Sequence, residues 1–285
     1  MQIGANVAFQ DVFTKSVLQG TIVSSSNDLV TIKTPDGRTY NRMASRVKPL
    51  NHQTVIPDIK ARFVYMRQAV EMVAKGNTAS AIISGPAGLG KTHSVEATLK
   101  GMRLVKDADY FYVKGFTSAR GLFEALYHNN GKLTVFDDCD SALKDRISAS
   151  ILKGALDSYA VRDISWKVKA ATMDANIPLD FKFTGGVIFI TNYLIHQLDR
   201  PLRTRSLVID LQMTKEEILA WMEEILPNIA GFTMESKIKA LAFIRKSAPA
   251  IRELSIRTIL MVLRVMETHP DGWEESAHYF ITQMQ

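Results

Sequence analysis

The feature that most constrains the fold is a glycine-rich loop between residues 85 and 92. It reads Gly-Pro-Ala-Gly-Leu-Gly-Lys-Thr and matches every fixed position of the phosphate-binding pattern G-x-x-x-x-G-K-[ST]. The apolar run 81–84 before it predicts a buried strand, and residues 93–100 after it predict a helix. The pattern is informative only between a strand and a helix, and that condition is met. The chain is therefore expected to form an α/β sheet with a phosphate site at the end of a strand.

The residue types in this loop predict its ligands. Glycines let the backbone turn tightly, so that successive N–H groups point at phosphate oxygens, and the following helix N-terminus adds partial positive charge. Lys91 is expected to reach the β- and γ-phosphates of ATP, and the Thr92 hydroxyl to bind Mg²⁺. The predicted nucleotide-binding residues are Gly85, Pro86, Ala87, Gly88, Leu89, Gly90, Lys91, Thr92 and His93. ATP and Mg²⁺ are the cofactors that this loop implies.

A second signal lies about forty residues further along the chain. The apolar run 133–136 leads directly into the carboxylates Asp137 and Asp138. Beside a phosphate loop, Asp137 is expected to hold Mg²⁺ and Asp138 to orient or deprotonate an attacking water. Paired aspartates after a strand also serve as helix caps, which is the alternative interpretation.

Composition sets wider limits. With 285 residues, 46% hydrophobic and 22% charged, the chain is typical of a globular protein with one large domain or two smaller ones. Lys and Arg number 35 against 29 Asp and Glu, a balance that permits a nucleic-acid partner without requiring one. A single cysteine cannot form an intrachain disulfide, which fits a reducing cytoplasm. Neither a signal peptide nor a membrane-spanning run is evident, so no membrane partner is expected.

The first fifty residues differ from the rest. Short alternating segments at 7–9, 20–23, 29–33 and 38–40 predict strands, with turns at 24–28 and 35–37. Together with a final strand at 46–50, this order resembles SH3-like, Tudor or KOW-type barrels, which bind nucleic acid, peptides or other domains. We therefore predict an all-β SH3-like barrel at 1–50 and a linker at 51–57. Its lysines and arginines are either a binding face or an ordinary solvated surface.

Helices and strands alternate from residue 58 to about 212. Helices are predicted at 62–75, 118–128 and 142–158, and strands at 110–113, 133–136, 187–190 and 207–209. Such alternation predicts a mostly parallel sheet with helices on both faces. The β pattern stops after residue 212, and four helices are predicted at 215–225, 235–247, 254–267 and 273–282.

From about residue 57 to the C-terminus, these motifs resemble the AAA+ ATPases. Asp138 departs from the family pattern, which usually has Glu; its shorter side chain implies slow turnover or a shared role. Asn192, after the strand 188–191, resembles the sensor 1 residue that helps to place the water. Residues 201–205 resemble the arginine-finger segment of RuvB-type and clamp-loader members, with Arg205 the first choice and Arg203 the second. Arg257 matches the sensor 2 arginine of the helical lid.

Two further segments have the residue types of a substrate contact. Residues 161–169 and 181–183 predict an inserted hairpin that resembles the pre-sensor 1 hairpin of helicase-type and initiator-type members. Trp166, beside Lys167 and Lys169, either stacks on bases or packs as core. Phe116, in the segment 114–116, is a candidate to grip a threaded peptide or nucleic acid.

The resemblance implies an α/β AAA+ sheet covered by helices, a C-terminal helical lid at 213–285, and the nucleotide-binding domain at 51–212. It further implies ATP hydrolysis at subunit interfaces of a ring or spiral homo-oligomer, with a hexamer as the family expectation, in the cytoplasm of a bacterial cell or a phage-infected host. The first functional interpretation is a motor or loader that acts on DNA or a DNA-processing complex. The alternative is a protein-remodelling chaperone that uses the N-terminal barrel as a client adaptor. A non-catalytic nucleotide switch is the third.

Overall fold

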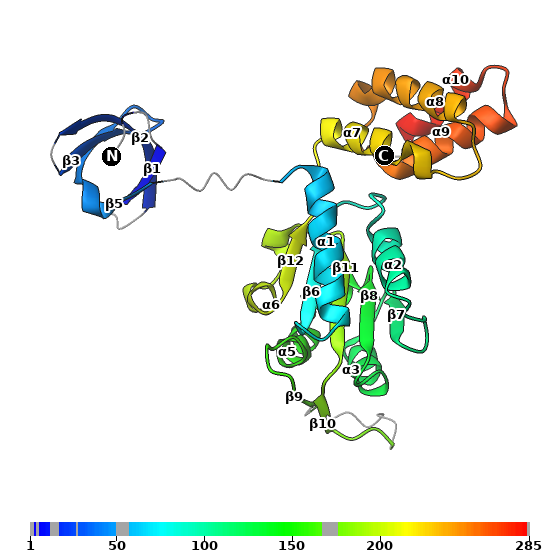
Figure 1. Cartoon of the computed structure of the whole chain (residues 1–285), viewed down its shortest axis with the longest axis horizontal. Helices are drawn as coiled ribbons and strands as arrows, with labels where there is room; N and C mark the ends of the chain where they lie inside the picture. Colours follow the sequence, from blue (N-terminus) through cyan, green and yellow to red (C-terminus); the bar gives the residue numbers. More distant parts are fainter. Residues whose placement is uncertain are drawn as a thin grey trace. The chain divides into compact units, whose positions relative to one another are not determined.

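The computed structural model describes residues 3, 6–11, 17–26, 28–49, 57–166 and 176–283. The chain forms two compact units, Met1–Pro57 and Asp58–Gln285, which are the blue and the cyan-to-red parts of Figure 1. Each unit is described by itself. The predicted division at residues 50 and 212 stays a prediction, and residues 51–56 of the predicted linker lie outside the described residues.

The first unit is an antiparallel sheet with the strand order β4-β3-β2-β1-β5. Its strands are β1 (Asn6–Gln10), β2 (Val17–Ser26), β3 (Leu29–Lys33), β4 (Thr39–Met43) and β5 (Val47–Pro49). Alternate side chains such as Val30 and Ile32 point into a small apolar core. Gly20 is required where β2 crosses this core, because a Cβ there would lie 2.6 Å from Ile32 Cγ2. Within the described ranges no ladder joins β4 to β5, so closure into a barrel stays a prediction.

The second unit contains a parallel sheet with the order β12-β6-β11-β8-β7. Its strands are β6 (Ser80–Ser84), β7 (Tyr110–Lys114), β8 (Leu133–Asp137), β11 (Gly186–Thr191) and β12 (Leu207–Asp210). Every residue of β6 and β8 is buried, since both faces of the sheet are covered. The predicted fold class is therefore confirmed: a mixed α/β chain with a parallel sheet between helices and an N-terminal antiparallel sheet.

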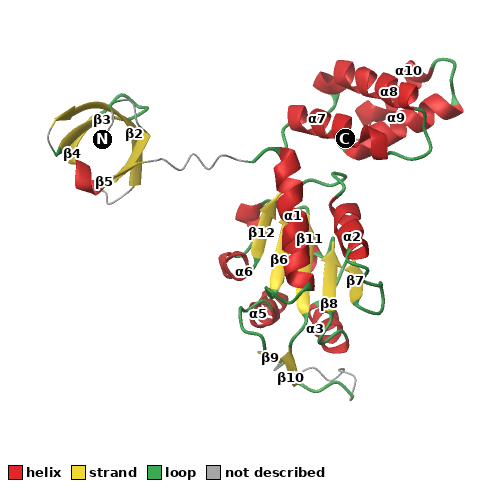
Figure 2. Cartoon of the chain, viewed as in Figure 1, coloured by secondary structure: helices red, strands yellow, loops and turns green. Residues whose placement is uncertain are grey.

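Two helical layers cover this sheet (Figures 1 and 2). Helices α1 (Ile59–Ala74) and α2 (Lys91–Gly101) pack on one face, against strand residues such as Ile83 and Ile190. Helices α3 (Ala119–His128), α5 (Arg146–Ala155) and α6 (Arg200–Arg205) pack on the other face, against residues such as Phe136 and Phe189. Alternate residues of one strand thus contribute to two separate cores.

The helix predicted at 142–158 is wrong in its extent. The structure has a short helix α4 (Asp140–Lys144) and then α5, with Asp145 extended between them at φ −68° and ψ 131°. The Asp145 carboxylate accepts hydrogen bonds from the Ser148 backbone N at 2.7 Å and from its hydroxyl at 2.9 Å. An aspartate that caps a new helix in this way competes with continuation of the old one.

The C-terminal region is helical, as shown in Figure 2. Its main helices are α7 (Lys215–Ile225), α8 (Met234–Ser247), α9 (Ile256–Thr268) and α10 (Trp273–Gln283). The buried guanidinium of Arg62 on α1 donates to the Gln212 carbonyl and pairs with Glu217, at the connection from β12 to α7. Phe63 stacks on Trp221 of α7 with ring centroids 4.3 Å apart. None of the described helices combines the length and apolarity that crossing a membrane requires.

Candidate nucleotide site

The candidate site lies where three parallel strands end together. In the register of the sheet, Thr191 of β11 lies beside Ser84 of β6, and Ile190 lies beside Asp137 of β8. The loops that follow these strands therefore emerge at one edge of the sheet, where ligands of parallel α/β sheets bind. The residues predicted from three separated motifs are brought together there.

The phosphate loop has the backbone that its glycines permit. Gly88 and Gly90 have φ of 73° and 86°, a left-handed region that other residues rarely occupy. Gly90 caps α2 with no side chain, which leaves the first N–H groups of the helix open to a bound anion. The loop also contacts the helical region: the Ile256 N–H donates to the Gly88 carbonyl at 3.0 Å, and Leu89 is fully buried in the helical core. The phosphate loop is therefore in direct contact with the C-terminal helices.

Lys91 is a buried cation with short polar contacts. Its ammonium donates to the carbonyls of Gly85 at 2.6 Å and Pro86 at 2.7 Å, and to Asn192 Oδ1 at 2.9 Å. Burial lowers the pKa of Lys91 to about 8, while the carboxylates of Asp138 and Asp137 partly oppose that shift. Lys91 is thus partly deprotonated in mildly alkaline solution when no phosphate is bound.

This shift predicts a pH dependence of ATP binding. A bound phosphate favours the charged form of Lys91, so above pH about 8 binding must take up a proton. The association constant is expected to be flat below pH 7.5 and to fall by up to about tenfold per unit above pH 8. Calorimetry in buffers of different ionisation enthalpy measures the proton uptake. The control is Lys91→Arg, whose side chain stays charged, so its proton uptake on ATP binding should be abolished. Equal proton uptake by the two proteins would contradict the assignment of this proton to Lys91.

Asp137 and Thr92 form the candidate magnesium site. The Thr92 hydroxyl lies 3.0 and 3.1 Å from the two carboxylate oxygens of Asp137, which is buried. A hydroxyl and a carboxylate are the hard oxygen ligands that Mg²⁺ accepts, with phosphate and water completing its shell. Within the described part of the chain no cluster of three or more His, Cys, Asp or Glu offers a full protein cage. The pair therefore fits Mg²⁺ carried by a nucleotide.

Lys114 is an additional residue at this site. Its ammonium lies 3.4 Å from Asp137 Oδ2 and 3.8 Å from Glu96 on α2. The sequence pattern indicates Lys114 only as part of the segment 114–116, the candidate substrate contact. The useful signal was its place at the end of β7, in register with Asp137.

Asn192 connects the lysine to the second carboxylate. Its amide Nδ2 donates to Asp138 Oδ1 at 2.9 Å, while its Oδ1 accepts from Lys91. Asp138 is exposed and has φ of 55°, an uncommon conformation that Asp tolerates better than most residues. Asp140 instead accepts a 2.5 Å bond from the Thr191 hydroxyl. The arrangement leaves Asp138 as the solvent-facing carboxylate beside the phosphate loop.

The three predicted arginines fall in two places. Arg257, exposed at the start of α9, lies next to the phosphate loop, since a Cβ on Gly88 would be 3.4 Å from its Cδ. Arg205 and Arg203 lie on α6 at the other end of the sheet. The Arg205 carbonyl accepts from the hydroxyl of Ser80, the first residue of β6, whereas the phosphate loop follows its last residue.

Arg205 is therefore separated from the phosphate loop of its own subunit. The five residues of β6 span about 16 Å at roughly 3.3 Å each, more than an arginine side chain reaches. In this structure its guanidinium donates to the Pro201 carbonyl at 3.1 Å and lies 3.8 Å from Asp157. The Arg203 Nε is buried and meets no partner among the described residues.

The two candidate substrate contacts differ in exposure. Strands β9 (Arg162–Ser165) and β10 (Asp180–Phe183) pair as the predicted hairpin. Trp166 is only 6% exposed and packs against Phe123, so the core alternative is right and base stacking by Trp166 is wrong. Lys167 and Lys169 lie outside the described residues. Phe116, on the loop after β7, is 83% exposed.

Comparison with known proteins gives one clear relative. The chain is 32% identical over 238 residues to a protein of Enterobacteria phage T4, described as the "Uncharacterized 36.7 kDa protein in nrdC-mobD intergenic region". The match covers 77% of this chain and 73% of the phage protein. The chain belongs to the family of this phage T4 protein. The match to this phage protein therefore covers much more of the chain than any single motif. No family model matches the chain.

Solved structures of lower similarity were also found. Thermotoga maritima RuvB R170A is 11% identical, with a TM-score of 0.47 over 78% of this chain and 68% of that one. The T. maritima RuvB Holliday junction branch migration motor is 13% identical, with a TM-score of 0.45 over 79% of this chain and 68% of that one.

The chemistry of the single cysteine gives a further prediction. Cys139 is 1% exposed, and burial raises the pKa of its thiol to about 12. The native protein should therefore react with a disulfide reagent at pH 8 more than tenfold more slowly than the urea-unfolded chain, as followed by thiolate release. Equal rates would show that the segment after β8 opens freely.

Proposed function

We propose that this chain is a Mg²⁺-dependent ATPase of the AAA+ type, which hydrolyses ATP between subunits of a ring or spiral and acts on DNA or a DNA-processing complex. The observation that carries the ATPase proposal is that three groups meet where the parallel strands end. These groups are Lys91, the pair Thr92 and Asp137, and the pair Asn192 and Asp138. A buried lysine, a hydroxyl–carboxylate pair and an oriented exposed carboxylate are the groups that phosphoryl transfer to water requires.

The geometry suggests how these residues act. Lys91 exchanges its contacts with the Gly85 and Pro86 carbonyls for phosphate oxygens, with the loop N–H groups around them. Mg²⁺, when bound, neutralises phosphate charge. Asn192, released from Lys91, keeps its bond to Asp138 and orients that carboxylate. Asp138 then accepts the proton of the attacking water.

The position of Arg205 supports hydrolysis across a subunit boundary. Since it lies a strand length from its own phosphate loop, a neighbouring subunit has to supply this cation. Such a contact joins different surfaces of two copies, and its closed form is a ring. A hexamer is the oligomer that the AAA+ resemblance implies.

The DNA assignment rests on charge and on Phe116. The chain has a formal charge of +6, and Phe116 is an exposed aromatic on the loop after β7. That combination suits stacking on bases beside phosphates. An exposed aromatic also grips peptides, so protein remodelling remains the second candidate function.

One experiment separates these proposals. The ATPase rate is measured with no DNA, single-stranded DNA and double-stranded DNA, each at low and high salt. We expect stimulation by DNA that declines with salt, because phosphate contacts release counterions. Lys91→Ala should bind no nucleotide and sets the background; activity no higher than this background contradicts the ATPase proposal. Activity that DNA leaves unchanged at both salts would favour a protein client.

The contribution of Phe116 is tested in the same assay. Phe116→Ala should keep the basal rate and lose most of the stimulation by DNA, since a stacked base contributes about 1–3 kcal/mol. Val105→Ala, which shortens another exposed apolar side chain, is the matched control. Equal stimulation of both variants would remove Phe116 from the DNA contact.

A further inference from the structure

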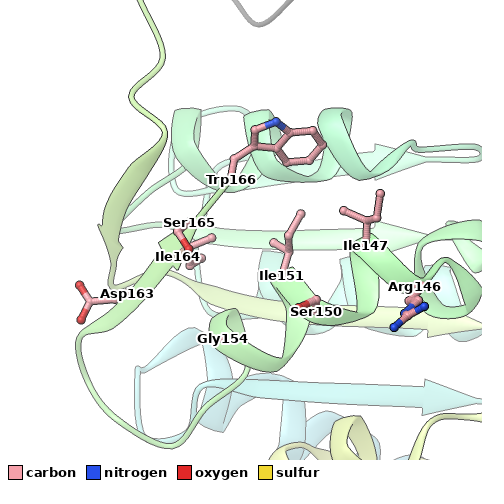
Figure 3. A pocket seen from close by; sticks show the side chains of 9 residues that line it. All are labelled: Arg146, Ile147, Ser150, Ile151, Gly154, Asp163, Ile164, Ser165 and Trp166. Atoms are coloured by element: carbon pink, nitrogen blue, oxygen red, sulfur yellow. The ribbon is translucent and has the colours of Figure 1, made fainter. Parts of the chain in front are cut away.

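A groove between α5 and the hairpin strand β9 is separate from the nucleotide site. It encloses about 600 Å³, and Figure 3 shows α5 side chains on one wall and β9 side chains on the other. Its apolar lining comes from Ile147, Ile151, Ile164 and Trp166. Ile147 is 42% exposed although it lies in this apolar surface. The volume lies in the range of binding pockets.

The walls of the groove are held together at one end. The buried guanidinium of Arg162 on β9 donates to the Ala155 carbonyl of α5 at 2.9 Å and to the Gly185 carbonyl at 2.5 Å. Near that end, a Cβ on Gly154 would lie 3.4 Å from the Asp163 carbonyl, so helix and strand nearly touch. This end of the groove is therefore fixed, which lowers the ordering cost of binding.

The strand wall presents unpaired backbone groups. The Trp166 N–H donates to the Leu179 carbonyl at 2.6 Å, and Ser165 lies opposite Asp180. In an antiparallel pair the hydrogen-bonded residues alternate, so Asp163 and Ser165 direct their N–H and C=O groups away from β10. No other strand of the described chain pairs with that edge of β9. At Asp163 this edge is covered by α5, since Gly154 lies close to the Asp163 carbonyl, so the part that is open to an extended peptide is at Ser165.

Charge selects among possible occupants. Arg146, exposed at the start of α5, lines one end of the groove and has no acidic partner among the described residues, and Asp163 lines the other end. Among the described residues that line the groove, a nucleic-acid strand would meet one cation and one carboxylate, whereas nucleic-acid grooves are positively charged throughout. A peptide carboxylate near Arg146 would pair with its guanidinium, and apolar side chains of the peptide would pack on the apolar lining. The indole N–H of Trp166 is buried and meets no partner in the described part of the chain, and it is a further polar group beside the groove.

We propose that this groove binds a short extended segment of a partner protein, with apolar residues at alternating positions and an acidic residue that pairs with Arg146. The segment adds to the free edge of β9 through the backbone of Ser165 and inserts apolar side chains between Ile147, Ile151 and Trp166. This role is independent of the ATPase proposal, since no residue of the groove belongs to the nucleotide site.

The test uses a phage-displayed library of random linear peptides selected on the full chain. Enriched peptides are synthesised with a fluorophore, and binding is measured by anisotropy. We expect an alternating apolar pattern with an acidic residue. Ser150→Trp, which fills the groove, should weaken binding at least tenfold, whereas Ser158→Trp, at an exposed serine beyond α5, should not. Absence of enrichment, or equal binding by the two variants, overturns the proposal.

A second pair of measurements addresses charge and backbone pairing without filling the groove. Arg146→Glu, at an exposed position, should lower affinity several-fold for the acidic peptide and raise it for the same peptide with lysine in place of the acid. Two series of peptides are N-methylated on the backbone, one at odd positions and the other at even positions. Only one of the two series should lose binding. If neither Arg146→Glu nor N-methylation changes the affinity, or if oligo-dT displaces the peptide, the result contradicts an extended peptide in this groove.

Discussion

Replacing Arg205 with alanine is expected to leave ATP binding intact and to lower the hydrolysis rate on the order of 10³-fold or more, as for other arginines that act in trans. The physical reason is position: the backbone of Arg205 lies at the start of β6, and the phosphate loop follows the end of this strand, which is about 16 Å long. We therefore expect Arg205 to stabilise transition-state charge on the nucleotide of a neighbour. Binding is measured by calorimetry and turnover by phosphate release.

The structure supplies a matched control for this variant. Arg205 lies 3.8 Å from Asp157 of its own subunit, and each side chain is about a third exposed. If that ion pair were its only role, Asp157→Asn would reproduce the effect of Arg205→Ala. We expect Asp157→Asn to retain activity, because losing this exposed contact frees the arginine without removing it.

Mixed assemblies give the sharper test. Subunits with Arg205→Ala and subunits with Asp138→Asn should each be nearly inactive alone. In a mixture, some interfaces join an intact Asp138 site to an intact Arg205 from the neighbour, and activity should return there. If hydrolysis does not recover although co-assembly is verified, the result contradicts sites that act independently across each subunit boundary. Recovery with Arg203→Ala in place of Arg205→Ala would move the role to Arg203.

Replacing Asp138 with asparagine is the second large effect. The amide keeps the size of the side chain and its bond with Asn192, but it cannot accept a proton. ATP binding should persist while hydrolysis falls by about 10²–10⁴-fold, the usual contribution of a general base. Single-turnover hydrolysis separates this chemical defect from slow product release.

Two neighbouring aspartates are the controls for this assignment. Asp140→Asn loses a bond from Thr191 and should alter turnover far less than Asp138→Asn. Asp137→Asn should weaken Mg²⁺-dependent binding or turnover, since it changes the carboxylate beside Thr92. Hydrolysis that survives in Asp138→Asn but not in Asp140→Asn would make Asp140 the base.

The sequence by itself determined the α/β fold class and the candidate phosphate loop. Both signals are local: a continuous apolar run predicts a strand buried on both faces, as β6 and β8 are, and glycines at fixed spacing predict a loop with positive φ, as at Gly88 and Gly90. The capping competition at Asp145 is also local, but helical periodicity on both sides of that residue conceals the break between the two helices.

The relations between motifs were decided only by the tertiary structure. Asn192 lies between Lys91 and Asp138 because β6, β8 and β11 are in parallel register, and no single segment encodes that register. Leu89 joins the core of the C-terminal helices because the phosphate loop packs against them, with the Ile256 N–H bonded to the Gly88 carbonyl. Trp166 has the same neighbours in the sequence whether it packs on Phe123 or stacks on a base. Burial depends on which distant surfaces meet, and those contacts form only when the whole sheet is assembled.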